Sequence, residues 1–251
     1  AITAPDAVLE DGDNIVVTVS PTDIDAGASL TVTVSTNNGS LFPAGTITVS
    51  PETGGTGVER TITMDPPDNQ NGTALVTVSV TDGSESVSQQ FTATVTALND
   101  APTITSTADS TANEDELYSY TITASDVDVG DNLTYAAPTI PSWLSFNAST
   151  HVLSGTPLNA NVGDTTVVLT VTDNGEGTLQ DSQTFTITVT NTNDTPVLDL
   201  ISDPSAVLED GGNISVSITP TDIDAGASLT VTVTTNNGSL FPDSVITVSP
   251  E

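Results

Sequence analysis

The stretch that decides the fold is VLEDGDNIVVTVSPTDIDAGASLTVTVSTNNGSLFPAGTITVSPE, residues 8–52. It recurs as residues 207–251, identical at 36 of the 45 aligned positions. Within it, apolar and polar residues alternate over 15–20 and 30–36, with Gly, Pro, Asn and Asp between the runs. Alternation of this kind is typical of half-buried strands, and the residues between the runs form turns. The segment therefore predicts a small β unit that the chain repeats.

The same alternation continues through the rest of the chain. It covers, in order, residues 74–82, 90–97, 118–126, 165–173 and 183–191. No segment shows a convincing helical period over three turns. About seven short strands in about 100 residues predict a β-sandwich of immunoglobulin-like architecture. The expected fold class is all-β.

Two matching junctions divide the chain. They are ALNDAPTI, residues 97–104, and NTNDTPVL, residues 191–198. We therefore expect tandem sandwiches arranged end to end. Their predicted bounds are 1–99 for the first sandwich, 100–194 for the second, and 195–251 for an incomplete third that repeats 1–52.

The composition excludes several classes of function. The 251 residues carry 33 Asp and Glu against a single cation, Arg60, and the formal net charge is −32. Nucleic acid and anionic membrane surfaces are poor partners, because binding them requires clustered Lys and Arg. The absence of Cys excludes disulfides, cysteine nucleophiles and thiolate metal sites. No stretch approaches the ~20 apolar residues of a membrane span, so we expect no membrane insertion.

The acids are expected at the ends of the sandwiches. If the strands run alternately up and down, an Asp-x-Asp, a Glu-Asp and an Asn-Asp from different repeats converge. The group at the first junction comprises Glu10, Asp11, Asn99, Asp100, Asp126, Asp128 and Asp173, with Asp65 and Asp68 within reach. The group at the second comprises Glu114, Asp115, Asn193, Asp194, Asp222 and Asp224. A third group, at the opposite end of the first sandwich, is Asp23, Asp25 and Asp82.

This set of residues suits a hard cation. Calcium takes about six to eight oxygen ligands from carboxylates, Asn side chains and backbone carbonyls. The lack of His and Cys nearby argues against zinc, and magnesium prefers a tighter octahedron that keeps its waters. The alternative is that the acids are ordinary solvated turn residues. Their repetition in register with the linkers favours Ca2+ sites.

These motifs resemble those of cadherin-like tandem repeats, which occur in large bacterial surface adhesins. The segment LTYAAPTIPSWLSFNASTHVLSGTP, residues 133–157, is similar to the dystroglycan-type cadherin-like or "putative Ig" variety. The resemblance implies calcium bound between consecutive domains, where it stiffens the chain into a rod. The ligands it implies are Asn99, Asp100, Asn193 and Asp194 in the linkers, Asp126, Asp128, Asp222 and Asp224 in the loops, Asp173 at the end of a strand, and Glu10 and Glu114 from the preceding domain.

Two departures from the family pattern affect the sites. The linkers lack the longer run of acids and Asn found in animal cadherins, which leaves the number of ions per junction open. The third unit has no counterpart of Asp173 in this sequence.

Catalysis has little support in the sequence. His151 is the only histidine, in a stretch expected to form a turn, and no Gly-x-Ser-x-Gly motif accompanies it. The acids repeat with the domains, whereas an active site would occur once. We therefore expect no enzyme.

The sequence predicts extender modules of a long extracellular or surface-anchored protein, an adhesin stalk or a filament. The expected partners are adjacent repeats of the same chain, with an unidentified adhesive ligand elsewhere. One alternative is a module that binds a glycan or protein through Trp143. The other is a self-assembling filament or sheath, completed by strands from neighbouring copies.

Overall fold

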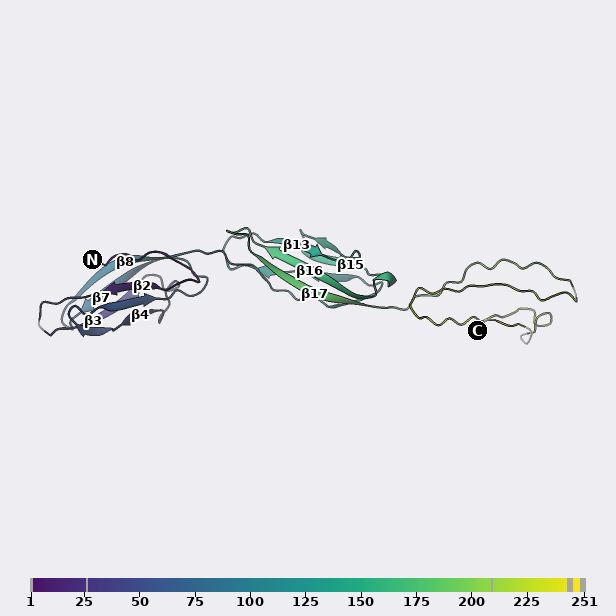
Figure 1. Cartoon of the computed structure of the whole chain (residues 1–251), viewed down its shortest axis with the longest axis horizontal. Helices are drawn as coiled ribbons and strands as arrows, with labels where there is room; N and C mark the ends of the chain where they lie inside the picture. Colours follow the sequence, from purple (N-terminus) through teal and green to yellow (C-terminus); the bar gives the residue numbers. More distant parts are fainter. Residues whose placement is uncertain (1, 26, 209, 243–245, 249–251) are drawn as a thin grey trace. The chain divides into compact units, whose positions relative to one another are not determined.

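The alternating runs of the sequence fold as strands. The computed structural model describes residues 2–25, 27–208, 210–242 and 246–248. Parts of the expected third sandwich, residues 209, 243–245 and 249–251, lie outside the described residues. Over the described ranges the regular structure is β-strand apart from one short 3-10 helix, η1 (Asn159–Asn161) (Figure 1). The predicted all-β class is confirmed.

The chain forms two compact units. Unit 1 comprises Ala1–Thr105, Ala124–Tyr135 and Thr170–Ser182, and unit 2 comprises Ser106–Thr123, Ala136–Leu169 and Gln183–Glu251. None of the described helices is long and apolar enough to cross a membrane.

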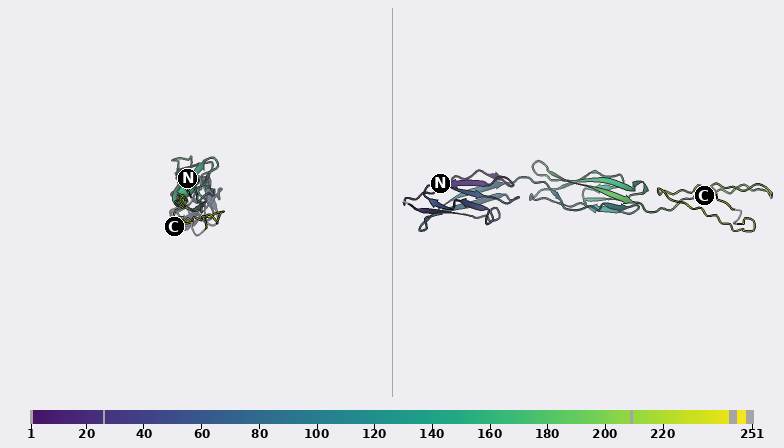
Figure 2. Two further views of the ribbon diagram at one scale, coloured as in Figure 1. Left: turned by 90° about the vertical axis from the view of Figure 1, so that its right-hand side faces the viewer. Right: turned by 60° about the horizontal axis from the view of Figure 1, so that its bottom comes forward.

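Unit 1 contains a five-stranded and a three-stranded sheet in two layers, drawn in purple and blue in Figures 1 and 2. The larger sheet has the order β1-β8-β7-β3-β5, from strands β1 (Val8–Leu9), β3 (Ser29–Thr36), β5 (Thr53–Gly55), β7 (Gly72–Thr81) and β8 (Ser86–Thr96). The smaller has the order β2-β6-β4, from β2 (Ile15–Val19), β4 (Ile47–Ser50) and β6 (Arg60–Met64). Strand β1 runs parallel to β8 and the other described pairs in these sheets are antiparallel.

The core of unit 1 lies between these two sheets. Alternate residues of β7 (Ala74, Val76 and Val78) are buried, as the period of two predicts. They belong to one buried cluster with Ile62 of β6 and Val32 of β3. The two inner faces therefore make the packed interior of a sandwich.

The only arginine of the chain is buried in this sandwich. Arg60 is 0% exposed, and its guanidinium donates hydrogen bonds to the backbone carbonyls of Val58 and Leu30. Gly54 leaves the space that the guanidinium occupies, since a Cβ there would lie 2.8 Å from Nη2. The cation therefore does not sit among the acids of the surface.

The remaining strands form three further sheets. A pair links β9 (Thr103–Ile104) to β12 (Ala124–Ser125). A four-stranded sheet has the order β10-β17-β16-β13, from β10 (Thr111–Asn113), β13 (Thr134–Thr139), β16 (Gly163–Thr172) and β17 (Gln180–Thr190). A three-stranded sheet has the order β11-β15-β14, from β11 (Tyr118–Thr121), β14 (Ser145–Asn147) and β15 (Val152–Gly155) (Figure 1). Buried apolar residues such as Leu153, Leu169 and Ile187 mark the inner faces.

The described residues after 194 contain no named strand. One isolated bridge joins Val197 and Thr221, with N–H to O distances of 2.7 and 2.9 Å. In unit 1 the matching segment 8–52 forms strands that pair with residues of 53–96. The three-part division of the chain stays a prediction.

Candidate metal centres

The Asp-x-Asp loops share one local conformation. The N–H of the second Asp donates to Oδ1 of the first, at 2.8 Å in the Asp23–Asp25 loop and 2.9 Å in the Asp126–Asp128 and Asp222–Asp224 loops. Two residues later stands a glycine with positive φ, which is 84° at Gly27, 105° at Gly130 and 81° at Gly226. Glycine adopts this conformation without the steric cost that a Cβ would bring. The sequence pattern D-x-D-x-G therefore encodes the loop.

Each linker makes the same bond to the second Asp of a loop. The backbone N–H of Asp100 donates to Oδ2 of Asp128 at 2.7 Å, and that of Asp194 donates to Oδ2 of Asp224 at 2.8 Å. The two predicted linker acids are thus brought beside the two predicted loop acids. An N–H held this close to a carboxylate fixes the linker relative to the loop.

A buried glutamate also bonds each linker. Glu10 and Glu114 are each 1% exposed. Oε1 of Glu10 accepts from the N–H of Leu98 at 2.9 Å, and Oε2 of Glu114 accepts from the N–H of Thr192 at 3.2 Å.

The acid that follows each glutamate has a different environment. Asp11 and Asp115 adopt left-handed backbone conformations, with φ of 58° and 62°. Asp tolerates this region better than most residues do. Within each Glu-Asp pair, it is the glutamate that accepts the hydrogen bond from the linker.

The first cluster brings three loop carboxylates together. Asp126, Asp128 and Asp131 offer oxygen atoms that lie within 4.8 Å of one another. Among the described residues, Oδ2 of Asp100, Asp126 and Asp131 are buried with no hydrogen-bond partner. Buried carboxylate oxygens without donors are costly unless something positive binds them. Asp131 is absent from the predicted set, because it stands outside the paired acids of the Asp-x-Asp motif.

Asp173 holds the linker amide at this cluster. The side chain is 4% exposed, and its Oδ2 accepts from Nδ2 of Asn99 at 3.1 Å. Its oxygens also accept from the N–H groups of Gly175 and Leu179 at 3.0–3.1 Å. Gly175 has no room for a Cβ, which would collide with Oδ1 of Asn99 and lie 2.8 Å from Oδ2 of Asp131. The site is thus closely packed around its oxygens.

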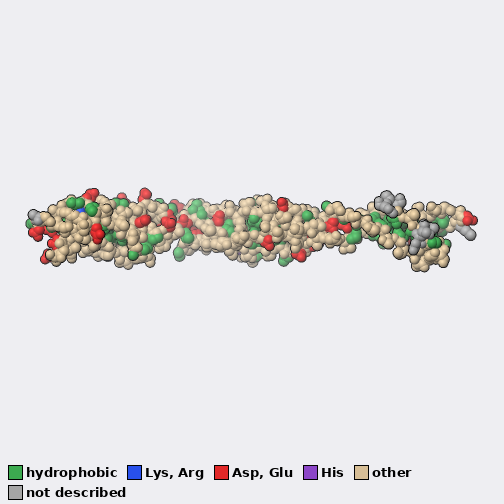
Figure 3. All heavy atoms as spheres, turned by 90° about the horizontal axis from the view of Figure 1, so that it is seen from below, with side chains coloured by type: hydrophobic (Ala, Val, Ile, Leu, Met, Phe, Trp, Pro, Cys, Tyr) green, Lys and Arg blue, Asp and Glu red, His purple; other side chains and the backbone are tan. Residues whose placement is uncertain are grey.

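The electrostatics of the first cluster favour a cation. Desolvation, and then the charges of Asp11, Asp128, Glu10 and Asp126, raise the pKa of Asp100 above its ordinary value. Desolvation and the neighbouring acids likewise raise the pKa of Asp131. In the space-filling view of Figure 3 the red carboxylates are accompanied by almost no blue. The charge that would relieve this repulsion does not come from a side chain.

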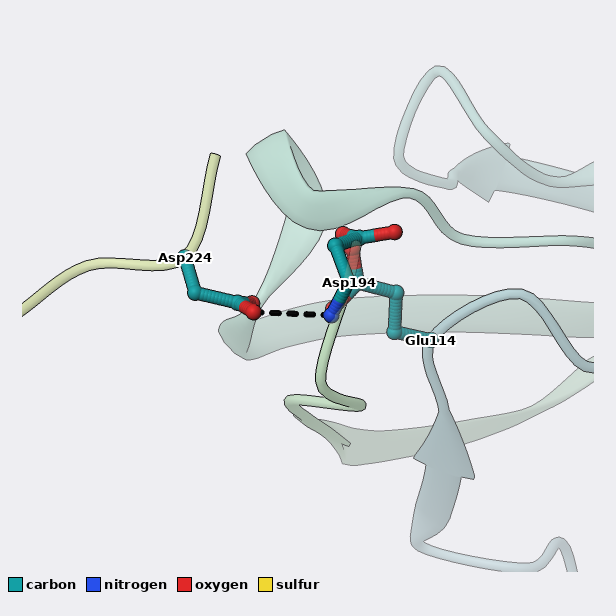
Figure 4. A group of neighbouring side chains, drawn as sticks. All are labelled: Glu114, Asp194 and Asp224. Atoms are coloured by element: carbon teal, nitrogen blue, oxygen red, sulfur yellow. Dashed lines mark hydrogen bonds between the residues drawn. The ribbon is translucent and has the colours of Figure 1, made fainter. Parts of the chain in front are cut away.

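The second cluster groups Glu114, Asp194 and Asp224, whose oxygens lie within 4.8 Å of one another (Figure 4). Desolvation and the acids nearby, Asp115 first, raise the pKa of Asp194. The pKa of Asp224 is lowered, chiefly by the N–H of Asp194 and then by the amide of Asn191, which donates to Oδ1 at 2.8 Å. The amide of Asn159 lies 3.4 Å from the same oxygen. This carboxylate is therefore already well solvated by donors.

Other predicted residues lie elsewhere or take local roles. Oδ1 of Asp82 accepts from the N–H groups of Ser84 and Glu85, which lowers its pKa, and no described contact joins it to the Asp23–Asp25 pair. Nδ2 of Asn193 donates to the carbonyl of Asp194 at 2.7 Å.

The loop that was expected to bring Asp65 and Asp68 to the first junction reaches its acids through amides instead. The N–H of Asn69 donates to Oδ1 of Asp11 at 2.9 Å. Nδ2 of Asn71 lies 3.2 and 3.1 Å from the two carboxylate oxygens of Glu10. Within the described part of the chain, no hydrogen bond joins the Asp65 or Asp68 side chain to these acids.

His151 and Trp143, the two residues considered for other functions, both contribute to the fold. His151 lies in the turn between β14 and β15 with φ of 59°, and its carbonyl accepts from the N–H of Ile122 at 3.0 Å. Trp143 is partly buried and packs edge-on against Tyr118, with ring centroids 6.1 Å apart and an interplanar angle of 84°. That geometry is typical of aromatic packing.

The paired sheets and their linkers define cadherin-like repeats of immunoglobulin-like sandwiches. Among solved structures, human CDH23 EC21–23 has a TM-score of 0.51 and 20% identity, covering 88% of this chain and 83% of that one. Residues 101–190 match the family described as "Putative Ig domain". The expected resemblance to cadherin-like repeats is thus confirmed.

Two protocadherin structures are also similar. The protocadherin gammaB7 EC3–6 cis-dimer has a TM-score of 0.49 and 19% identity, covering 89% of this chain. The protocadherin gammaB4 extracellular domain has a TM-score of 0.47 and 22% identity, covering 90%. The chain spans 59% and 40% of these two structures. No curated protein matches the sequence.

Proposed function

We propose that the chain is a set of structural extender modules from a long extracellular protein, stiffened by calcium at its linkers. The observation that carries the proposal is the repetition of one bonding pattern. In each linker a buried glutamate accepts from the N–H two residues before the linker Asp, and the linker Asp donates its own N–H to the loop Asp, at Asp100–Asp128 and at Asp194–Asp224. Because these residues take equivalent positions in two different linkers, we expect them to have the same function in both.

The donor set fits calcium on grounds of chemistry and burial. Carboxylate and amide oxygens are available at each linker, and three buried oxygens at the first have no donor. The residues proposed to hold the ion at the first linker are Glu10, Asp11, Asn99, Asp100, Asp126, Asp128 and Asp173. Those proposed at the second are Glu114, Asp115, Asn193, Asp194, Asp222 and Asp224. Asp23, Asp25 and Asp82 are proposed as a further group.

The stiffening rests on like-charge repulsion and its removal. Bound calcium would supply the positive charge that neutralises the carboxylates and a common point to which they are all held. In its absence the linker acids repel the loop acids, and hydrogen bonds such as that between Asp100 and Asp128 have to oppose this repulsion. With the acids of the predicted domains 1–99 and 100–194 held together, bending of the linker has to separate ligands from the ion.

The proposed setting is extracellular, at the cell surface, in an adhesin stalk or filament of the kind found in bacteria. Extracellular calcium modules bind at about 10⁻⁴–10⁻³ M, so the linkers would be stiff outside cells and loose at cytosolic calcium levels. The partners are adjacent repeats of the same chain, and we propose no catalytic role.

Thermal unfolding tests the proposal. The protein is heated in EDTA, in millimolar calcium, and in magnesium at equal ionic strength. Calcium at ~100-fold over its Kd stabilises by about 2.7 kcal/mol per site. We expect a calcium-specific rise in Tm that Asp128→Ala reduces. Equal small rises with both ions would mean charge screening alone and would overturn the calcium role.

A further inference from the structure

The two clusters differ at one position of an otherwise shared loop. The turn D-x-D-x-G is followed by Ala28 in the first repeat, Asp131 in the second and Ala227 in the third. The N–H of this residue lies 3.3, 3.4 and 3.2 Å from the carbonyl of the second Asp in the three loops, in that order. The backbone is therefore alike, and the side chain alone distinguishes Asp131.

Asp131 directs a carboxylate at the first cluster. Its oxygens lie within 4.8 Å of those of Asp126 and Asp128, and Oδ2 is buried with no hydrogen-bond partner. This oxygen lies close to the backbone of Gly175, where a Cβ would be 2.8 Å from it. A carboxylate held beside two others by local packing has a cation as its natural partner.

The second cluster has no such group. Ala227 offers no oxygen, and the loop acid Asp224 already accepts hydrogen bonds from Asp194, Asn191 and Asn159. In the first cluster, the recorded donors to Asp128 and Asp126 are the backbone N–H groups of Asp100 and Asp128 alone. The loop of the first cluster thus has one more carboxylate than the loop of the second, and fewer donors compete there with an ion.

We propose that Asp131 is an additional calcium ligand, and that it makes the first cluster the tighter of the two sites. The inference rests on the proposed function, because it concerns the same ion. Calcium affinity rises with the number of charged ligands in a site. The chain would therefore fill its linkers in order as calcium increases, the first before the second.

Isothermal titration of the whole chain with calcium, starting from EDTA-treated protein, tests this. We expect the two linker clusters to titrate as separate classes of site in the wild type. Asp131→Ala should weaken the tighter class by about tenfold or more, so that the classes merge. Ala227→Asp should strengthen the weaker class, and Glu59→Ala, an exposed acid remote in sequence from both loops, should change neither class. Circular dichroism checks that the variants fold.

The outcomes separate the two proposals. A wild type that binds calcium while Asp131→Ala titrates identically would overturn the role of Asp131 and leave the calcium sites standing. The same conclusion follows if Ala227→Asp gains no affinity and Asp131→Ala loses none. A wild type that binds no calcium would overturn both.

Discussion

The backbone N–H of Asp100 donates to Oδ2 of Asp128 at 2.7 Å, although both residues carry carboxylates. This bond holds an acid of the linker beside an acid of the loop, and Asp194 and Asp224 repeat it at 2.8 Å. The backbone thus enforces a proximity that the side-chain charges oppose. Such an arrangement costs free energy unless a cation is present, and this cost leads to the predictions below.

Neutralising Asp100 should have opposite effects with and without calcium. Asp100→Asn removes a charge that desolvation and four neighbouring acids disfavour. In EDTA we expect its Tm to equal or exceed that of the wild type, while its gain in Tm on adding calcium is smaller. Differential scanning calorimetry measures both. Glu59→Gln removes one charge from an exposed position and should keep the full calcium gain; a variant Asp100→Asn with the wild-type gain would show that Asp100 is no ligand.

The advantage of that variant should depend on pH. Because the pKa of Asp100 is raised in the folded protein, the folded state binds this proton at a pH where the unfolded chain has lost it. The repulsive cost is thus absent below the ordinary value of 3.8 and develops as pH rises through the raised value. In EDTA, the gap in unfolding free energy between Asp100→Asn and wild type should shrink as pH falls through the raised pKa of Asp100 towards 3.8. A gap that is constant with pH would contradict this origin.

The buried Glu10 needs its donors. Asn71→Ala removes the amide that lies 3.1–3.2 Å from both Glu10 carboxylate oxygens, and the glutamate is 1% exposed. We expect a loss of about 1–3 kcal/mol in unfolding free energy, measured by urea denaturation in EDTA. Gln70→Ala, which removes an exposed amide that donates only to the neighbouring carbonyl of Asn69, is the matched control and should lose much less.

Gly175 should be required for the first cluster alone. In Gly175→Ala the new methyl group would collide with the Asn99 amide and crowd Asp131. We expect weaker calcium binding in the tighter class, with the second class unchanged, in the same calorimetric titration. Gly39→Ala adds a methyl group where no atom lies within 4 Å and should leave both classes intact. Unchanged binding in Gly175→Ala would mean that the oxygens around Gly175 do not hold the ion.

Much of the fold follows from period-two alternation. The predicted runs 15–20, 30–36 and 74–82 correspond to strands Ile15–Val19, Ser29–Thr36 and Gly72–Thr81. The expected run 118–126 is two strands, Tyr118–Thr121 and Ala124–Ser125, because the first pairs with β15 and the second with β9. Alternation shows which residues are extended, but it does not show where a run changes its pairing partner.

The site residues that recur at equal spacing could be predicted from the sequence, and those that do not recur were missed. The pairs Asp126–Asp128 and Asp222–Asp224 and the linker acids Asp100 and Asp194 could be found from their recurrence. The residues equivalent to Asp131 in the other two repeats are Ala28 and Ala227, so recurrence does not mark it as a site residue. The backbone N–H of Asn69 and the side-chain amide of Asn71 reach Asp11 and Glu10 from a loop distant in sequence, and that proximity depends on tertiary packing.

The most direct test of calcium stiffening is the spread of distances across the first linker. The chain has no Cys, so Thr92→Cys on β8 and Ser119→Cys on β11, both at exposed positions, accept spin labels selectively. Pulsed electron paramagnetic resonance gives the distance distribution in EDTA, calcium and magnesium. We predict a broad distribution in EDTA and magnesium and a narrow one in calcium. Equally broad distributions in all three, with calcium binding established by titration, would contradict the stiffened linker.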